Sequence, residues 1–182
     1  MNTKSRVGEY FETYSGRPFW PRDPRPEDIC LEDIAHHLSL VCRFGGAVKR
    51  HYSVGQHSIF VHRICPDEFK FEGLFHDATE AYLGDVVRPL KYSLHEYLEA
   101  EAKLQRVISR MYGVPEKKSP PVQLADDIAL ITERNALFRR KSLKWAADLE
   151  RLNPSKVPIL ETTMEQTEDL WLFLAEAHLE KP

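Results

Sequence analysis

Cysteine and glycine are both scarce in this chain of 182 residues. The three cysteines, Cys30, Cys42 and Cys65, are far apart and include no CxxC pair. This pattern argues against a disulfide framework and against a zinc site built from thiolates. Only eight glycines are present, and the alternating runs that are typical of strands are hard to find. We therefore expect reduced thiols and a nearly all-α fold.

The sequence also lacks a long apolar segment and an excess of charge of either sign. No uninterrupted apolar run approaches the roughly 20 residues needed to cross a bilayer, and no cationic start leads into an apolar stretch. The formal net charge is −3, which gives no footprint for general binding to nucleic acids or membrane surfaces. We expect a cytoplasmic protein, in the host cytoplasm if a virus encodes it, with no stable nucleic-acid partner and no membrane partner.

The chain does contain enough apolar side chains, at helical spacing, for one helical domain. Apolar residues make up 42% of it, so residues 1–182 can bury a substantial core as a single all-α bundle. Residues 14–26 are too rich in proline for a helix and predict an ordered loop. Ser53 and Gln56 form a capping box for one helix. Another helix should run from about Asp67 to Gly84.

The segment GLFHDATEAYLGD, residues 73–85, places ionisable side chains on a helix that otherwise reads as buried. At about 100° per residue, His76 and Glu80 share one strip of the helix and Asp77 lies on the neighbouring strip, so all three can face one pocket. A carboxylate at the edge of a core is costly to desolvate and should be paired or bound to a metal. Glu80 is well placed to act as a general acid or base.

Two other helices offer side chains to the same pocket. His57 lies in the first turn after the capping box and should point inward. Asp126 and Asp127 follow the Pro120–Pro121 pair, and periodicity does not choose between them. Two imidazoles and two carboxylates suit one borderline divalent ion such as Zn²⁺, Co²⁺, Mn²⁺ or Fe²⁺. Such an ion lowers the pKa of bound water and binds a phosphoryl oxygen.

Each of these residues also has an ordinary structural interpretation. A single His-Asp pair is common by chance, and a lone buried histidine is more often part of a core or a cap than a ligand. Acidic residues in the first turn of a helix are favoured by the helix dipole. The hypothesis of a metal site depends on the occurrence of all the candidates, in order, on helices that a compact bundle brings together.

Together, YSVGQHS, LFHDATEAYLGD and QLADD resemble the HD-domain superfamily of metal-dependent phosphohydrolases, whose pattern is a His, a His-Asp doublet and a distant Asp. The likeness covers about residues 28–140. It implies an HD-type helical fold and a metal held by His57, His76, Asp77 and Asp126. Asp126 is favoured over Asp127 because the last ligand of the family usually follows a small residue. Because His57 and His76 are closer in sequence than in many members, the alternatives for the first ligand are His36, His37 and His51.

The segment HDATEAYLGDVVRPLKY is similar to bacterial 5′-deoxynucleotidases of the YfbR type. The wider arrangement of SGRPFWP, EDIAHHLS, CRFGG and YSVGQHS resembles a compact phage and bacterial branch of the superfamily that includes the dATP hydrolase DatZ. These likenesses imply removal of phosphate from a deoxynucleotide, first of all dATP, with dADP and dAMP, to give deoxyadenosine. They imply catalytic roles for Asp77 and Glu80, a place near the sugar for Asp85, and Mg²⁺ accompanying a triphosphate. The alternatives are a broad 5′-nucleotidase for deoxynucleoside monophosphates and a non-catalytic nucleotide-binding or sensor module.

Further contacts with the substrate are suggested by residue type. Cations that could hold phosphate oxygens are Arg17, Arg43, Arg88 and Lys91. Trp20 could stack on a base or exclude a ribose 2′-hydroxyl, and a core or lid aromatic is an equally good interpretation. The expected partner is thus a small deoxynucleotide. We also expect a homo-oligomer, whose number of subunits the sequence does not specify.

Overall fold

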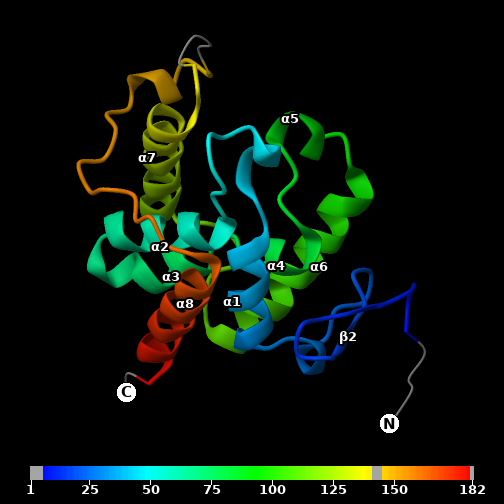
Figure 1. The fold of residues 1–182 in the computed structure, drawn as a ribbon. Helices are drawn as coiled ribbons and strands as arrows, with labels where there is room; N and C mark the ends of the chain where they lie inside the picture. The colour runs from blue at the N-terminus through cyan, green and yellow to red at the C-terminus, as the bar shows by residue number, and fades with distance from the viewer. Residues whose placement is uncertain (1–5, 141–144, 181–182) are drawn as a thin grey trace.

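The structure, a computed structural model, describes residues 6–140 and 145–180 and is mostly helical, which confirms the expected all-α class. Figure 1 shows the helices gathered into a bundle, with a small hairpin at one side. The helices are α1 (Leu31–Leu40), α2 (Val54–Ile64), α3 (Lys70–Phe75), α4 (Glu80–Leu83), α5 (Arg88–Lys91), α6 (His95–Tyr112), α7 (Pro120–Leu137) and α8 (Met164–Leu179). Short 3-10 segments lie at Pro26–Asp28, Arg43–Gly46, Asp67–Phe69 and Leu149–Arg151.

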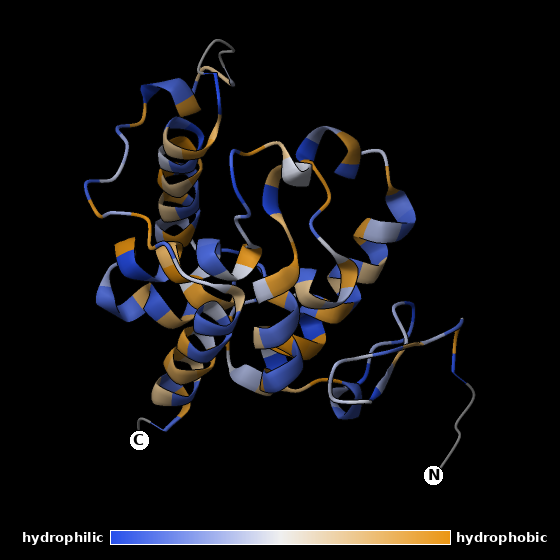
Figure 2. Ribbon diagram, in the orientation of Figure 1, coloured by the Kyte–Doolittle hydropathy of each residue, from blue (hydrophilic) through white to orange (hydrophobic). Residues whose placement is uncertain are grey.

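Helix α2 lies at the centre of the bundle and packs against α1, α3, α7 and α8. Its start follows the predicted capping box, in which Ser53 and Gln56 each accept a hydrogen bond from the other's backbone N–H. One apolar cluster joins α2 to α1, α3 and α8, and a second joins its other side to α7. Hydrophobic and hydrophilic residues alternate along the helices in Figure 2, as amphipathic packing requires. Side chains on α2 are therefore buried from its first turn onward.

The proline-rich segment is not only a loop. Pro18–Phe19 (β2) pairs with Phe11–Glu12 (β1) as a two-stranded antiparallel hairpin. The Phe19 side chain is fully buried, and its ring lies 4.4 Å from that of Tyr82. This contact attaches the hairpin to the bundle near α4, and Tyr14 in the turn of the hairpin stacks on His36 of α1 at 3.5 Å.

The prediction of one uninterrupted helix from Asp67 to Gly84 is wrong, because α3 ends at Phe75 and α4 begins only at Glu80. Between them, the N–H groups of Ala78 and Glu80 donate to carbonyls three residues earlier, at Phe75 and Asp77. Bonds of this 3-10 type wind the backbone more tightly than an α-helix. The His76–Asp77 doublet consequently lies on a tight turn rather than in the middle of a helix.

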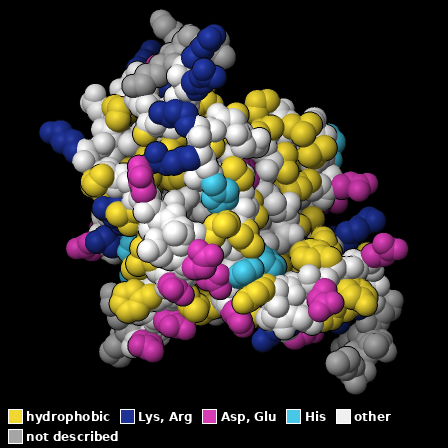
Figure 3. All heavy atoms as spheres, viewed as in Figure 1, with side chains coloured by type: hydrophobic (Ala, Val, Ile, Leu, Met, Phe, Trp, Pro, Cys, Tyr) yellow, Lys and Arg dark blue, Asp and Glu magenta, His cyan; other side chains and the backbone are white. Residues whose placement is uncertain are grey.

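Acidic, basic and apolar side chains are interspersed on the face shown in Figure 3, with the basic ones mainly toward the upper part and the acidic ones mainly toward the lower part. No single charge covers this face, in keeping with the small net charge of −3. None of the helices within the described ranges combines the length and the apolar character that spanning a bilayer demands.

Trp171 on α8 is the largest side chain of the main core, with no exposed surface, and its ring lies 5.0 Å from that of Phe75. We expect Trp171→Ala to lower the free energy of unfolding by about 3–5 kcal/mol, because it removes a buried ring and leaves a cavity. Urea denaturation measures this change. Phe173→Ala on the same helix is the matched control, since Phe173 is 65% exposed and its truncation should have little effect. Equal losses for the two variants would contradict the packing described here.

Candidate metal centre

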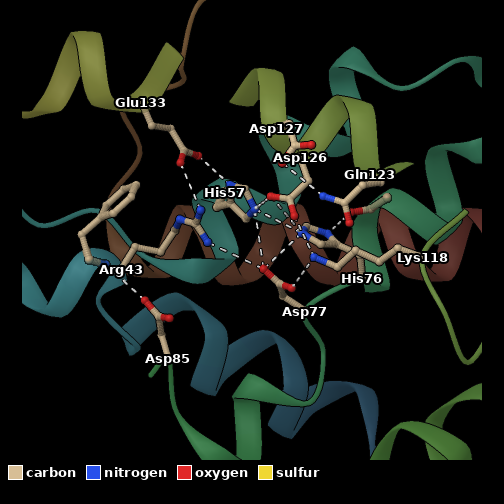
Figure 4. Close-up of polar contacts among 12 residues, drawn as sticks. Arg43, His57, His76, Asp77, Asp85, Lys118, Gln123, Asp126, Asp127 and Glu133 are labelled. Atoms are coloured by element: carbon tan, nitrogen blue, oxygen red, sulfur yellow. Dashed lines mark hydrogen bonds and ion pairs between the residues drawn. The ribbon is translucent and has the colours of Figure 1, made fainter. Parts of the chain in front are cut away.

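Three segments that are distant in sequence bring donor atoms to one buried point (Figure 4). His57 comes from the first turn of α2, His76 from the turn after α3, and Asp126 from α7. The two imidazole Nε2 atoms are 3.1 Å apart. The Oδ1 atom of Asp126 is 3.1 Å from Nε2 of His57 and 3.8 Å from Nε2 of His76. All three residues are buried, and together they form a group of donor atoms that could hold a metal ion.

Asp77 lies beside this group of three and approaches both imidazoles. Its Oδ2 atom is 3.1 Å from Nε2 of His76 and 3.6 Å from Nε2 of His57. Burial alone would raise the pKa of Asp77, but the charges of His76 and Lys118 outweigh it and hold the pKa well below its usual range. Burial likewise opposes ionisation of Asp126, whose pKa is held well below its usual range by Lys118 and His57. Both carboxylates are therefore ionised at neutral pH.

The hydrogen bonds at the far side of each ring determine what the two facing nitrogens can do. His76 places Nδ1 2.8 Å from the carbonyl oxygen of Gly73, which can only accept, so Nδ1 carries the proton. His57 places Nδ1 2.6 Å from Oε1 of Glu133, whose pKa is lowered by Arg43 and His57 in spite of its burial. In neutral rings both Nε2 atoms would then present lone pairs to each other. Such a contact needs a proton or a metal ion between the rings.

The spacing of the donor atoms fits a metal ion. Two ligand atoms that each lie about 2.1 Å from one ion are about 3.0 Å apart at a right angle, and farther apart at wider angles. The distances from the two Nε2 atoms to each other and to Oδ1 of Asp126 and Oδ2 of Asp77 run from 3.1 to 3.8 Å. Mixed nitrogen and oxygen ligands of this kind suit borderline divalent ions.

Close packing of α3 on α2 makes this spacing possible. A Cβ atom at Gly73 would lie 2.8 Å from Sγ of Cys65 and 3.6 Å from Cα of His62, so a larger residue would force this contact between α3 and α2 to shift. The same glycine supplies the carbonyl that orients His76. The approach of two backbones therefore positions one imidazole against the other.

Glu133 and Arg43 form a buried layer behind His57. Glu133 has no exposed surface and accepts a hydrogen bond from the Tyr52 hydroxyl at 2.8 Å. The Arg43 guanidinium lies 3.3 Å from Oε2 of Glu133 and 3.7 Å from Oδ2 of Asp77. When a carboxylate accepts a hydrogen bond from the ring nitrogen of a metal-binding histidine that faces away from the metal, it fixes the orientation and the tautomer of that imidazole. Arg43, predicted as a phosphate ligand, thus lies beside the donor group.

Lys118 lies on the other side of Asp77. Its Nζ atom is 3.1 Å from Oδ1 of Asp77 and 2.7 Å from Oδ2 of Asp126. Burial opposes the charge of Lys118, but these two carboxylates outweigh it and raise its pKa. Each carboxylate therefore directs one oxygen toward the imidazoles and the other toward a lysine.

Glu80 is buried near this group with a side-chain oxygen, Oε2, that finds no hydrogen-bond partner within the described ranges. Burial, together with the charges of Asp77 and Asp85, raises the pKa of Glu80 well above its usual value. A buried carboxyl that retains its proton near neutral pH can donate it to a leaving group. This environment agrees with the acid or base role predicted for Glu80.

Asp85 contacts the segment that carries Arg43. Its Oδ2 accepts a hydrogen bond from the N–H of Phe44 at 3.1 Å, and burial raises its pKa. Phe44 has a φ of 57°, a left-handed conformation that is unusual for a bulky residue. Strain of this kind tends to persist at functional sites, and here it lies directly after Arg43.

A pocket of about 280 Å³ opens beside the donor group and is lined by His76, Asp77, Lys118, Lys91 and the facing side of α6. This volume is just below the roughly 300–1,000 Å³ that is common for small-molecule sites. Lys91 donates to Oε1 of Glu101 at 2.6 Å, so its charge is paired on the pocket wall. The pocket offers room for a compact ligand next to His76 and Asp77.

Several residues proposed from the sequence lie outside this cluster. Arg17 is exposed and donates to the carbonyl of Glu27, and Trp20 packs against Tyr10 and Arg6 near the hairpin. Arg88 is exposed on α5. Their predicted contacts with the substrate remain predictions, and the structure shows ordinary structural contacts for Arg17 and Trp20.

The structure also separates the alternative ligands. Asp127 accepts a hydrogen bond from Gln123 on α7, whereas Asp126 faces the imidazoles. His36 pairs with Glu168, His37 with the carbonyl of Ala81, and His51 with the carbonyl of Leu40. Among the histidines considered for the first ligand, only His57 reaches the donor group formed by the described residues.

Three residues that contact the donor group or its neighbours were not assigned to the site from the sequence. Glu133 follows Asp126 by two helical turns and shares its face, so periodicity contained a signal for it. Tyr52 and Lys118 lie outside the helices, where no period predicts the direction of a side chain. Their placement came from the tertiary structure alone.

Comparison with known proteins identifies relatives but no activity. No protein-family model matches the sequence. The chain is 44% identical over 128 residues to the uncharacterized protein YfdR of Escherichia coli K12, an alignment that covers 70% of this chain and 72% of YfdR. It is 33% identical over 121 residues to an uncharacterized protein of Rhodobacter capsulatus, covering 61% of this chain and 62% of that protein. Neither name states a function.

We expect the chain to bind one Co²⁺ or Mn²⁺ ion, and Asp126→Asn to weaken this binding by more than about 100-fold, because loss of a direct ligand should exceed the 10–100-fold typical of groups behind the ligands. Asp127→Asn is the matched control and should bind like the wild type. Isothermal titration calorimetry on the chelator-treated protein measures both. A larger loss for Asp127→Asn would contradict the orientation of α7 described here.

Proposed function

The chain belongs to the same family as YfdR of Escherichia coli, and we propose that it is an HD-type, metal-dependent phosphohydrolase that removes phosphate from a small deoxynucleotide. The observation that carries this proposal is the convergence of two imidazoles and two ionised carboxylates at one buried point. The Nδ1 partners of both rings leave Nε2 free to bind a cation. The proposed ligands are His57, His76, Asp77 and Asp126.

The donor set is suited to hydrolysis as well as to binding. A divalent ion held there would lower the pKa of a water molecule and polarise a phosphoryl oxygen. Arg43 lies 3.7 Å from Oδ2 of Asp77, where its guanidinium can stabilise negative charge on the phosphoryl group. Burial limits the competition from bulk water and strengthens these interactions.

Glu80 completes the proton transfers of the proposed reaction. The oxygen of a water molecule forms a bond to phosphorus while the bond from phosphorus to the leaving oxygen breaks. Glu80 donates its proton to the leaving oxygen and regains one from the attacking water. Its raised pKa keeps the carboxyl protonated at a pH where an exposed glutamate would be ionised.

A deoxynucleotide is proposed as the substrate on the strength of the segment HDATEAYLGDVVRPLKY and of the position of Asp85. Asp85 accepts a hydrogen bond from the N–H of Phe44, next to Arg43, and we propose that it contacts the sugar. We propose dATP as the preferred substrate, with hydrolysis proceeding through dADP and dAMP to deoxyadenosine. The pocket of about 280 Å³ is small, and monophosphates are therefore also candidate substrates.

With Mn²⁺ or Co²⁺ added, we expect the chain to release phosphate from dATP, and excess EDTA to abolish this activity. A panel of deoxynucleoside triphosphates and monophosphates, read by phosphate release, determines the substrate. His76→Ala should be inactive because it removes a proposed ligand, whereas His51→Ala, an exposed histidine, should retain activity. A chain that binds nucleotide and metal without releasing phosphate would instead be a sensor module.

We expect Glu80→Gln to lower kcat by roughly 100-fold or more, as is typical for loss of a general acid, without a matching loss of metal affinity. The wild-type activity should fall as the pH rises through the raised pKa of Glu80, because the ionised carboxylate cannot donate a proton. Rate profiles against pH should lack this alkaline limb in Glu80→Gln. An unchanged alkaline limb would assign the proton transfer to another group.

A further inference from the structure

Lys118 reaches the site from a loop rather than from a helix. It lies between α6 and α7, close to Ser119, whose N–H donates to Oε1 of Glu72 at 2.6 Å. The loop backbone is exposed, but the Lys118 side chain reaches inward and keeps only 29% of its accessible surface. The bond to Glu72 on α3 holds the loop where this reach is possible.

The ammonium of Lys118 uses the outer oxygens of both aspartates. It lies 3.1 Å from Oδ1 of Asp77 and 2.7 Å from Oδ2 of Asp126, while the imidazoles are approached by Oδ2 of Asp77 and Oδ1 of Asp126 (Figure 4). Lys118 therefore does not compete for the point where the donor atoms converge. Its contacts are compatible with a metal ion bound by the inner oxygens.

One hydrogen-bond donor of Lys118 is left for another molecule. An ammonium group has three N–H donors, and two of them serve Asp77 and Asp126. Lys118 also lines the 280 Å³ pocket, together with His76 and Asp77. A cation with a spare donor thus borders the space in which a ligand can reach the donor group.

The other nearby cations are placed differently from Lys118, since Arg43 is not among the residues that line the pocket and Lys91 lines it beside Glu101. Lys91 forms an ion pair with Glu101 at 2.6 Å, and Arg43 is buried against Glu133 at 3.3 Å. Two carboxylates close to a phosphate would repel it, and Lys118 offsets that charge where the pocket meets Asp77. The location of Lys118 suits an anion better than does the location of Lys91.

We propose that Lys118 is a substrate-binding residue, whose ammonium donates to a phosphoryl oxygen in the pocket while it holds the outer oxygens of Asp77 and Asp126. The inference rests on the proposed function, since it assumes a phosphate ligand next to a bound metal. In this role Lys118 binds the phosphate anion and is not a ligand of the metal ion. Loss of the charge should weaken phosphate binding and should not weaken metal binding.

The test uses the full chain loaded with Co²⁺, titrated with orthophosphate and followed by the visible absorption of the metal. Lys118→Gln should bind orthophosphate about tenfold more weakly or worse, as expected for loss of a hydrogen bond to a charged group. Its affinity for Co²⁺, measured by calorimetry, should equal or exceed that of the wild type. Lys118→Met, which keeps much of the apolar stem, should show the same loss of phosphate affinity and the same Co²⁺ affinity as Lys118→Gln. It serves as the test variant if Lys118→Gln does not fold.

Two further variants serve as controls. Lys118→Arg keeps the positive charge and should retain most of the phosphate affinity. Lys117→Gln removes the charge of the exposed neighbour, which makes no ion pair among the described residues, and should match the wild type. These comparisons separate a local contact from a general change in charge.

The outcomes distinguish this inference from the function on which it rests. Unchanged orthophosphate affinity in Lys118→Gln, or a loss of Co²⁺ affinity as large as the loss of phosphate affinity, would overturn the assignment of Lys118. A wild-type chain that binds Co²⁺ but neither binds orthophosphate nor releases it from any nucleotide would overturn the proposed function itself.

Discussion

The contact between the imidazoles of His57 and His76 is the constraint on which the rest of the site depends. Each ring donates its Nδ1 proton away from the other, to Glu133 and to the carbonyl of Gly73, so the Nε2 atoms meet at 3.1 Å as a pair of acceptors. A proton or a metal ion between the rings resolves this conflict, and the ionised carboxylates nearby favour the positive charge. The surrounding helices, packed on both sides of α2, hold the rings in this arrangement.

Positively and negatively charged side chains alternate around this contact. Arg43 and Lys118 lie on opposite sides of Asp77 and contact different oxygens of its carboxylate. Glu133 balances Arg43, whereas Glu80 forms no ion pair among the described residues, and burial together with the charges of Asp77 and Asp85 raises its pKa. Charges removed from water must be paired or neutralised. The same rule thus favours an ionised carboxylate at Asp77 and a raised pKa at Glu80, three residues later.

Much of this arrangement was predictable from the sequence. Helical periodicity and the capping box at Ser53 placed His57 in the first turn of α2, and the spacing within the 73–85 segment placed His76, Asp77 and Glu80 near one another. The break between α3 and α4 was not predicted. The residues there have the spacing of a continuous helix, which gives no sign of the local change from α-type to 3-10-type hydrogen bonds. Trp20 and Arg17 were candidates by residue type only, and residue type does not locate a loop in space.

The order of residues along the chain by itself determined the all-α class, the chemistry of the donor atoms, and the helices that carry His57 and Asp126, since these follow from local spacing. Only the tertiary structure decided that Asp126 rather than Asp127 faces the imidazoles, that Glu133 lies behind His57, and that Lys118 joins the two carboxylates. The physical reason is that periodicity specifies a face relative to its own helix. The neighbour that this face meets depends on how the helices pack, and a loop has no period from which its direction could be derived.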